Sequence, residues 1–309
     1  MNMALLDEFQ DSLDSAIART VSVEFGRLRD GLEAETIAGH IHNSMVELRK
    51  LRKLRMPDYQ YEWLAPFYTS WYQPGQVHLA YSLIREVMGR QGERLTQNSA
   101  GNLCVVDFGC GASATRFGLT LAVARAIRDG QKVGRIKIYG IDISQPMVDM
   151  GENLWADWGR AIPCTGYLRD AYEKVEAENT TRILGWTPPE EPDIADSDRW
   201  LIALHTAYQS NIVVVGEHLR HIANAFNPRA GFLTSHISNM QAVRGISPFT
   251  NVESPAPAMR LYADCPETTE WRQGLCFEFV DHLSDKDYNY LHNEVGYDLE
   301  APYCLLHVV

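Results

Sequence analysis

The chain has 309 residues, of which 45% are hydrophobic and 22% charged, and its formal net charge is −12. This composition is close to the average of globular proteins, so it excludes disorder over most of the chain. No apolar run approaches the roughly 20 residues that cross a bilayer, and residues 1–19 are too acidic and polar for a signal peptide. We therefore expect a cytoplasmic protein with no membrane partner.

The acidic net charge disfavours nucleic acid as a partner, because it repels phosphate backbones at long range. One basic run opposes this inference, and it consists of Arg49, Lys50, Arg52, Lys53 and Arg55. A solvated helix face is the simpler interpretation of the run, and a phosphate-binding strip is the alternative.

The six cysteines form no CxxC pair, and no Cys/His cluster has the spacing of a zinc finger. Cys104 and Cys304 stand in apolar runs and are expected to pack as small hydrophobic residues. Neither a structural disulfide nor a bound metal is therefore expected.

The first 95 residues are expected to form a helical cap in front of a second domain, residues 96–309. Apolar side chains recur at helical spacing over residues 5–54. Met56-Pro57-Asp58 breaks this pattern and precedes an aromatic stretch, residues 59–72. Pro74-Gly75 breaks it again before a helical pattern over residues 77–88, and residues 89–102 are polar and predict a linker.

From residue 103 onward the pattern alternates between strands and helices. Strands are predicted at residues 103–107, 136–141, 181–186, 200–204, 231–236, 276–280 and 303–309. Helices are predicted at residues 117–127, 146–158, 166–178, 212–226 and 285–295, with loops at residues 187–198 and 246–266. A repeated strand–helix–strand order predicts an α/β fold, in which a parallel sheet carries helices on its faces.

The first strand runs into a glycine-rich loop in which Gly109, Gly111 and Ala114 satisfy a G-x-G-x-x-[G/A] pattern. Such a loop suits either a dinucleotide or S-adenosylmethionine (SAM), because glycines let the backbone approach a ligand without a Cβ clash. Asp107 stands two residues before the first glycine, where a carboxylate would face a diphosphate unfavourably. It would favour SAM, which carries an ammonium and a sulfonium group.

Asp142 ends the second predicted strand, where a carboxylate can accept hydrogen bonds from both hydroxyls of a ribose. Its distance along the chain from the glycines exceeds the roughly 20 residues of a dinucleotide fingerprint. This spacing again favours SAM over NAD.

Two segments resemble the motifs of class I SAM-dependent methyltransferases. Val105-Val-Asp-Phe-Gly-Cys-Gly-Ala-Ser113 is similar to the first motif of that family, and Tyr139-Gly-Ile-Asp-Ile-Ser144, followed by Pro146-Met147, is similar to the second. The resemblance covers roughly residues 103–309. It implies a Rossmann-like, seven-stranded methyltransferase sheet that ends in a reversed strand pair.

The resemblance also implies roles for individual residues. The Asp107 position lies near the methionine end of SAM, Asp142 binds the ribose, and Ile143 flanks the adenine. The backbone of the glycine loop packs against SAM. The full set of expected cofactor-binding residues is Tyr72, Asp107, Gly109, Cys110, Gly111, Asp142, Ile143, Met147 and His205.

The chain departs from the family pattern at two places. The acidic residue that commonly contacts the adenine amino group could be any of Glu190, Glu191, Asp193, Asp196 or Asp198. No Asn-Pro-Pro-Tyr tetrapeptide follows the fourth strand, which disfavours the chemistry of DNA-adenine methylases.

His205 and Tyr208 follow the fourth predicted strand instead, and His236 ends the fifth. Ligands of open α/β sheets bind outside the carboxyl ends of the strands, so these side chains are expected to face the cleft. His205, Tyr208 and His236 are the candidate catalytic residues, with His205 as a general base. A histidine that only shapes the pocket is the alternative, since methyl transfer needs little more than an aligned acceptor.

The aromatic stretch has two interpretations. It is either the core of the helical cap or a lid over SAM and the acceptor, in which aromatic faces attract the sulfonium. Tyr68, Trp71 and Tyr72 are the residues closest to Pro74-Gly75 and are the first candidates for a lid.

These observations predict a SAM-dependent methyltransferase that acts on a small molecule, with methyl transfer to an O, N or C atom. The alternatives are an RNA methyltransferase of the ribosomal type, a non-catalytic SAM-fold partner subunit and, more distantly, an NAD-dependent oxidoreductase. The sequence leaves the assembly state open, with a homodimer as one option.

Overall fold

The structure is a computed structural model, and it describes residues 3–52, 55–189, 196–204, 211–235, 240–248 and 303–308. Six strands form one sheet in the order β3-β2-β1-β4-β5-β6. The strands are β1 (Leu103–Phe108), β2 (Ile136–Ile141), β3 (Val175–Thr180), β4 (Asp198–Ala203), β5 (Ala230–Ser235) and β6 (Tyr303–Val308).

Five of these strands run parallel, and β6 runs antiparallel to β5. This arrangement confirms the predicted α/β class with a parallel sheet. The expected seventh strand, residues 276–280, and the helix expected at residues 285–295 lie outside the described residues.

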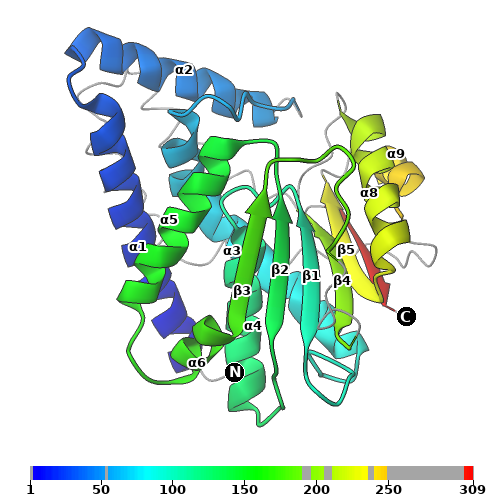
Figure 1. Ribbon diagram of the computed structural model, residues 1–309. Coiled ribbons are helices and arrows are strands. Elements are labelled where there is room, and N and C mark those ends of the chain that lie inside the picture. The colour runs from blue at the N-terminus through cyan, green and yellow to red at the C-terminus, as the bar shows by residue number, and fades with distance from the viewer. Residues whose placement is uncertain are drawn as a thin grey trace.

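Helices cover both faces of the sheet (Figure 1). One face carries α3 (Leu64–Arg90), α4 (Ala114–Arg128), α5 (Gln145–Ala161) and α6 (Tyr167–Lys174), and the other carries α8 (Ile212–Phe226) and α9 (Met240–Ile246). The remaining described helices are α1 (Met3–Arg29) and α2 (Ala34–Arg52). Together with α3 they belong to residues 1–95, which we call the N-terminal segment.

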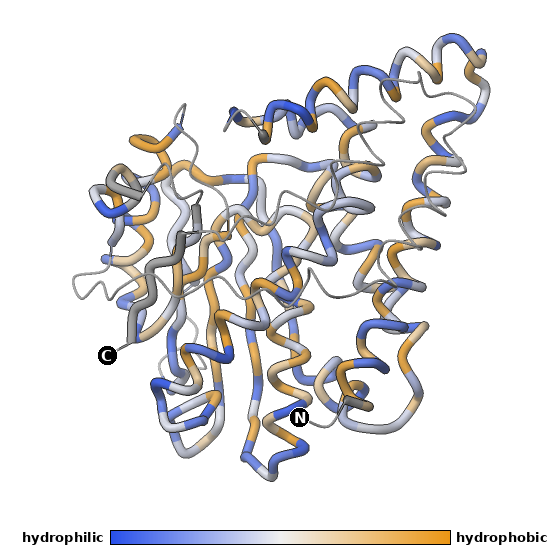
Figure 2. The backbone as a smooth tube through the Cα atoms, turned by 180° about the vertical axis from the view of Figure 1, so that it is seen from behind, coloured by the Kyte–Doolittle hydropathy of each residue, from blue (hydrophilic) through white to orange (hydrophobic). Residues whose placement is uncertain are grey.

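Every side chain of β1 is buried, as expected of a central parallel strand covered on both faces. Val105 belongs to the core under α3 and α4, whereas its neighbour Val106 belongs to the core under α8. This alternation follows from the two-residue period of a strand. Figure 2 shows the hydrophobic residues concentrated along the strands, and hydrophilic residues recurring along α1 and α2.

The N-terminal helices share one hydrophobic core with the sheet. That core joins Phe9 and Phe25 of α1 and Phe67 of α3 to Phe117 of α4 and Trp158 of α5. Phe9 and Phe117 each meet the Trp158 ring edge-on at 5.4 Å between centroids. Burial of these rings, together with the aliphatic side chains of the same face of α1, favours docking of the helix.

Helix α3 differs from its prediction, because it is continuous from Leu64 to Arg90 and contains Pro74. A proline inside a helix removes one backbone hydrogen bond and costs about 3 kcal/mol. Here Pro74 and Gly75 are both buried, so packing against α4 and the sheet outweighs the local preference for a break. The second part of the aromatic stretch, from Phe67 to Tyr72, therefore lies within α3, whereas Tyr59, Tyr61 and Trp63 precede the helix.

The third strand also differs from its prediction. The structure ends α6 at Lys174 and places β3 at Val175–Thr180, where a helix to residue 178 and a strand at 181–186 were expected. β3 is an edge strand with polar residues, and Glu176 and Glu178 form ion pairs with Arg135 and Lys137. Its apolar residues are few, because only Val175 and Ala177 alternate with the two glutamates before the polar Asn179 and Thr180, so the strand signal in its sequence is short.

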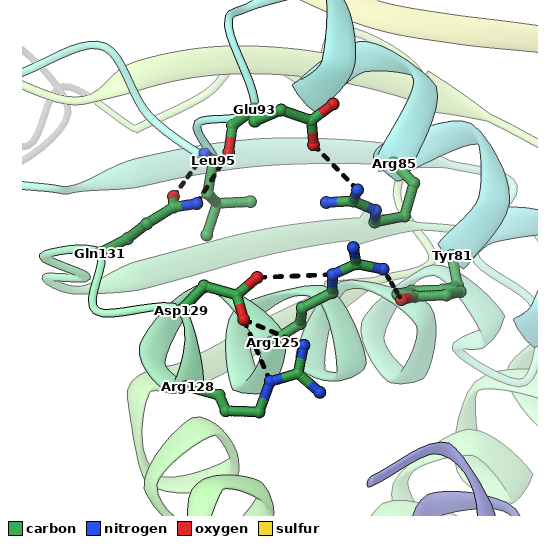
Figure 3. Close-up of polar contacts among 8 residues, drawn as sticks. All are labelled: Tyr81, Arg85, Glu93, Leu95, Arg125, Arg128, Asp129 and Gln131. Carbon is green, nitrogen blue, oxygen red and sulfur yellow. Dashed lines mark hydrogen bonds and ion pairs between the residues drawn. The ribbon is translucent and has the colours of Figure 1, made fainter. Parts of the chain in front are cut away.

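A polar cluster fastens the far ends of α3 and α4 (Figure 3). Arg125 of α4 donates to the hydroxyl of Tyr81 in α3 at 3.3 Å. Gln131 accepts from the backbone N–H of Leu95 at 3.1 Å and donates to the carbonyl of Glu93 at 2.7 Å. These contacts fix the chain that connects α3 to β1.

The two helices cross closely at Gly118 of α4. A Cβ atom at this position would lie 2.7 Å from the backbone nitrogen of Tyr81 and 2.9 Å from the carbonyl oxygen of Val77. Both atoms belong to the backbone of α3, so neither can move aside cheaply. Gly118 therefore sets the distance between α3 and α4.

Gly118→Ala should lower the free energy of unfolding by about 1–3 kcal/mol, the typical cost of overpacking a core. Gly39→Ala is the matched control, because a Cβ at this helical position meets nothing within 4 Å. The control should be neutral or stabilising by about 0.5–1 kcal/mol, since alanine favours helix more than glycine does. Urea denaturation of the two variants measures both effects, and equal stability of the two would contradict the close crossing.

Candidate functional site

The glycine loop, residues 109–113, follows β1 at the carboxyl edge of the sheet. Gly109 and Gly111 have φ angles of 75° and 48°, and Ser113 has 66°. Positive φ is accessible to glycine without steric cost, which explains the residue type at the first two positions. The N–H of Gly109 donates to the carbonyl of Ile141 at 2.6 Å, which ties the loop to β2.

The carboxylate of Asp142 binds the same loop. Its Oδ2 accepts a hydrogen bond from the N–H of Gly111 at 2.8 Å, and its Oδ1 accepts one from the N–H of Ser144 at 2.8 Å. Burial raises the pKa of Asp142, and these backbone amides oppose the rise. Each carboxylate oxygen keeps a second lone pair, so Asp142 can accept further hydrogen bonds while its orientation is fixed.

Asp107 lies beneath the loop, where only 1% of its surface is exposed. Its Oδ1 accepts a hydrogen bond from the hydroxyl of Thr115 at 3.0 Å. Burial raises the pKa of Asp107 to about 7; Thr115 opposes the rise and the nearby charge of Asp142 adds to it. The carboxyl group therefore titrates near neutral pH, as a buried acid without a full set of donors does.

The remaining expected cofactor residues around the loop also converge here. Cys110 is buried, and its burial raises the pKa of the thiol. The Met147 methyl group lies 3.8 Å from where a Cβ of Gly111 would stand, and Met147 packs with Ala112. Ile143 is 49% exposed, so its side chain is available to a ligand.

The N-terminal segment reaches this site through the start of α3. Tyr68 packs against the apolar group of Ala112 and Met147, and its ring stacks on Tyr72 at 5.1 Å between centroids. Tyr72 is partly buried. Trp71 is buried and stacks on Phe67 at 6.0 Å, as a core residue.

A second part of the N-terminal segment crosses the carboxyl edge of the sheet. We call residues 55–60 the crossing segment. Gln60 donates to the carbonyl of Ile143, and the hydroxyl of Ser144 donates to the carbonyl of Tyr59 at 2.5 Å. At its other end, the amide of Asn211, which precedes α8, lies 3.6 Å from the sulfur of Met56.

The crossing segment is thus attached to the loops that follow β2 and precede α8. In Figure 1 helix α2 lies on the side toward which the arrows of the parallel strands point. The backbone N–H of Asp58 also donates to Glu47 of α2 at 2.6 Å. These contacts place part of the N-terminal segment over the carboxyl edge, where ligands of open α/β sheets bind.

The candidate catalytic residues His205, Tyr208 and His236 lie outside the described residues, as do Glu190, Glu191 and Asp193.

Asp198 is one of the candidates for the adenine contact, and its position excludes that role. It begins β4, at the amino edge of the sheet, and its carboxylate accepts from the N–H of Gln97. Asp196 is exposed just before it.

Four polar residues around the loops were missed by reasoning from the sequence: Gln60, Gln73, Thr115 and Ser144. Gln73 is buried in α3, and its amide donates to the carbonyl of Ala112 at 2.6 Å. A glutamine directly before Pro74, next to the aromatic residues Trp71 and Tyr72, was the available signal. Ser144 begins α5 as its N-cap and accepts from the N–H of Met147 at 3.2 Å, a pattern that a serine before proline could have indicated.

Within the described ranges, no group of three or more His, Cys, Asp or Glu side chains could hold a metal ion. The helices described here include none long and apolar enough to cross a membrane.

In the basic run, Lys50 pairs with Glu47 at 2.5 Å and Arg55 is exposed, while the side chains of Arg52 and Lys53 are not described.

Comparison with known proteins gives matches among solved structures. No protein-family model matches the chain. No curated protein matches it either. The solved structures of similar fold include class I SAM-dependent methyltransferases, at low sequence identity.

Three of these structures illustrate the similarity. An N-methyltransferase of Haemonchus contortus, in complex with phosphomonomethylethanolamine and S-adenosylhomocysteine, is 12% identical at a TM-score of 0.42 over 82% of this chain. This chain spans 61% of that protein's length. Loganic acid methyltransferase with S-adenosylhomocysteine is 9% identical at a TM-score of 0.41, over 77% of this chain and 94% of that one.

The third is a Listeria monocytogenes protein described as a class I S-adenosylmethionine-dependent methyltransferase. It is 10% identical at a TM-score of 0.37, over 98% of this chain and 89% of that one.

Titration of Asp107 should appear in the pH dependence of stability. The folded pKa of about 7 lies above the value of about 3.9 in an unfolded chain. The stabilisation from this group is therefore complete below about pH 4 and is lost as the pH rises through 7. Between pH 5 and 8 the loss amounts to about 2–3 kcal/mol, at about 1.4 kcal/mol for each pKa unit.

Asp107→Asn keeps the shape of the side chain without the titration. The variant should gain about 2–3 kcal/mol relative to the wild type when the pH is raised from 5 to 8 in the absence of ligand. Urea denaturation at both pH values measures the difference, and the other titrating groups cancel in it. A constant difference between the two proteins would contradict a raised pKa.

Proposed function

We propose that the chain is a SAM-dependent methyltransferase that acts on a small molecule. The observation that carries the proposal is the 2.8 Å hydrogen bond from the N–H of Gly111 to Asp142. In a dinucleotide site the glycine-loop amides and the helix N-terminus receive a phosphate. In this chain an anionic side chain already binds one of those amides, so a phosphate would meet a carboxylate.

The second carboxylate supports the same choice of cofactor. SAM carries no phosphate and presents an ammonium and a sulfonium group, both of which suit a site lined by Asp107 and Asp142. A cation that binds beside a buried carboxyl group with a pKa of about 7 lowers that pKa, so the group becomes more fully ionised. Binding of SAM near pH 7 should then release a proton from Asp107.

The residues present fit this cofactor. Asp142 would hold the ribose hydroxyls with its free lone pairs, and the exposed side chain of Ile143 would flank the adenine. Asp107 would stabilise the positive charge at the methionine end, and Tyr72 would cover the site from α3. When bound, SAM supplies a methyl group that is activated for transfer by the positive charge on its sulfur.

The methyl acceptor is proposed to be a small molecule, because the chain has a net charge of −12, which disfavours a polyanion. His205, Tyr208 and His236 remain the proposed acceptor-side residues, with His205 as a general base for an O or N acceptor. Exclusion of water by the crossing segment would strengthen the electrostatic interactions around the sulfonium.

Isothermal titration calorimetry tests the cofactor. SAM and S-adenosylhomocysteine should bind, and NAD should not. Asp142→Ala should weaken SAM binding by about 1.5–3 kcal/mol for each ribose hydrogen bond that it removes. Asp149→Ala, which removes an exposed carboxylate of α5, should leave the affinity unchanged.

Binding of NAD without binding of SAM would overturn the proposed function. Equal SAM affinity of Asp142→Ala and Asp149→Ala would remove Asp142 from the site. The RNA alternative would gain support from RNA binding that weakens steeply with salt and is lost when the basic run is neutralised.

A further inference from the structure

Gln73 is a residue of the N-terminal segment that contacts the glycine loop directly. It lies on α3, 39 residues before the loop, yet its Nε2 donates to the carbonyl of Ala112 at 2.6 Å. Gln73 is 1% exposed, and Ala112 is also buried. A buried amide that loses its hydrogen-bond partner destabilises the folded protein. This hydrogen bond therefore fixes the position of the loop relative to α3.

The glycine loop needs such support because of its backbone conformation. Ser113, directly after Ala112, has a φ of 66°, which is unfavourable for a residue with a Cβ atom. Such a conformation persists only where surrounding contacts determine it. Contacts on both sides of the Ala112–Ser113 pair therefore decide whether the loop keeps its shape.

On the opposite side the pair is bounded by Gly151 of α5. A Cβ at Gly151 would lie 2.7 Å from the hydroxyl oxygen of Ser113 and 2.9 Å from the carbonyl carbon of Ala112. The loop is thus held between the amide of Gln73 and the bare backbone of Gly151. Of the two, only Gln73 makes a directional contact, and it binds the peptide unit whose N–H, at Ser113, donates to the carbonyl of Cys110 at 2.8 Å.

The Ala112 peptide follows directly on Gly111, whose N–H donates to Asp142. A change in the Ala112 peptide would therefore displace the N–H of Gly111 and release Asp142 from its fixed orientation. We propose that Gln73 is a positioning residue for the cofactor, which acts through the glycine loop and Asp142 without touching the ligand. This inference rests on the proposed function and adds to it a residue from the N-terminal segment.

The test compares Gln73→Met with Ser70→Ala. Met keeps the length of the side chain without its donor. Ser70 is the matched control, because it is equally buried in α3, and its hydroxyl donates to the carbonyl of Pro66 at 2.7 Å, within its own helix. Each variant removes one buried hydrogen bond from α3, but only one of these bonds reaches the glycine loop.

Both variants should lower the melting temperature by a few degrees. Gln73→Met should raise the Kd for SAM about five- to tenfold, the factor that corresponds to one hydrogen bond of about 1–1.4 kcal/mol. Ser70→Ala should change the Kd by less than about twofold. Without ligand, the amide of Gly111 should exchange with solvent faster in Gln73→Met than in the wild type, and at an unchanged rate in Ser70→Ala.

The outcomes separate the two levels of the inference. If the wild type does not bind SAM, the proposed function fails, and the cofactor role of Gln73 fails with it. If the wild type binds SAM but the two variants have the same Kd and the same Gly111 exchange, the role of Gln73 is overturned alone. If Gln73→Met does not fold, Gln73→Asn replaces it, since that side chain keeps the amide but is one methylene too short to reach Ala112.

Discussion

The hydrogen bond between the N–H of Gly111 and the carboxylate of Asp142 joins the two loops on which the candidate site depends. One loop follows β1 and the other follows β2, and the parallel pairing of these strands brings both loop starts to the same edge. Because Asp142 also accepts from Ser144 at the start of α5, the bond connects the ends of two strands to the beginning of a helix. The local geometry of the site follows from this connection.

The same arrangement explains why the site is electrostatically costly to the folded protein. Asp107 and Asp142 interact unfavourably, and burial disfavours the charged form of both. Backbone amides compensate Asp142, whereas among the described residues Asp107 accepts from the neutral hydroxyl of Thr115. Asp107 is therefore the less satisfied of the two. A bound cation would offset this unfavourable electrostatic energy. Functional sites commonly combine such a loss of stability with a gain in binding.

The parts of the fold that could be predicted from sequence are those where local pattern and tertiary environment agree. Strand β2 and helix α8 have the bounds that apolar runs and helical spacing predicted, because each is flanked by residues that end such elements. β3 was misplaced because two of its residues, Glu176 and Glu178, are charged and form ion pairs with Arg135 and Lys137 at the neighbouring strand. The apolar residues after it attracted the prediction instead, yet Leu184 among them is 88% exposed.

For the site, the sequence identifies residues whose type is itself informative. Asp107, Gly109, Gly111 and Asp142 stand at the ends of predicted strands, and parallel topology alone brings them together. Gln73 and Gln60 could not be found in this way. Their partners are backbone carbonyls 39 and 83 residues away along the chain, and a carbonyl acceptor leaves no signature in the sequence. Only the docking of α3 and the crossing segment reveals these contacts.

That docking depends on a residue remote from the ligand. Gly118 lets α4 approach the backbone of α3, and the approach brings the start of α3 against the glycine loop. A larger separation of the helices would withdraw the amide of Gln73 from Ala112 and the ring of Tyr68 from Met147. The N-terminal segment therefore contributes both to the hydrophobic core and to the carboxyl edge of the sheet. Close approach of α3 and α4 in the core and the position of Gln73 at the glycine loop belong to one helix, so a change at the crossing should be felt at the loop.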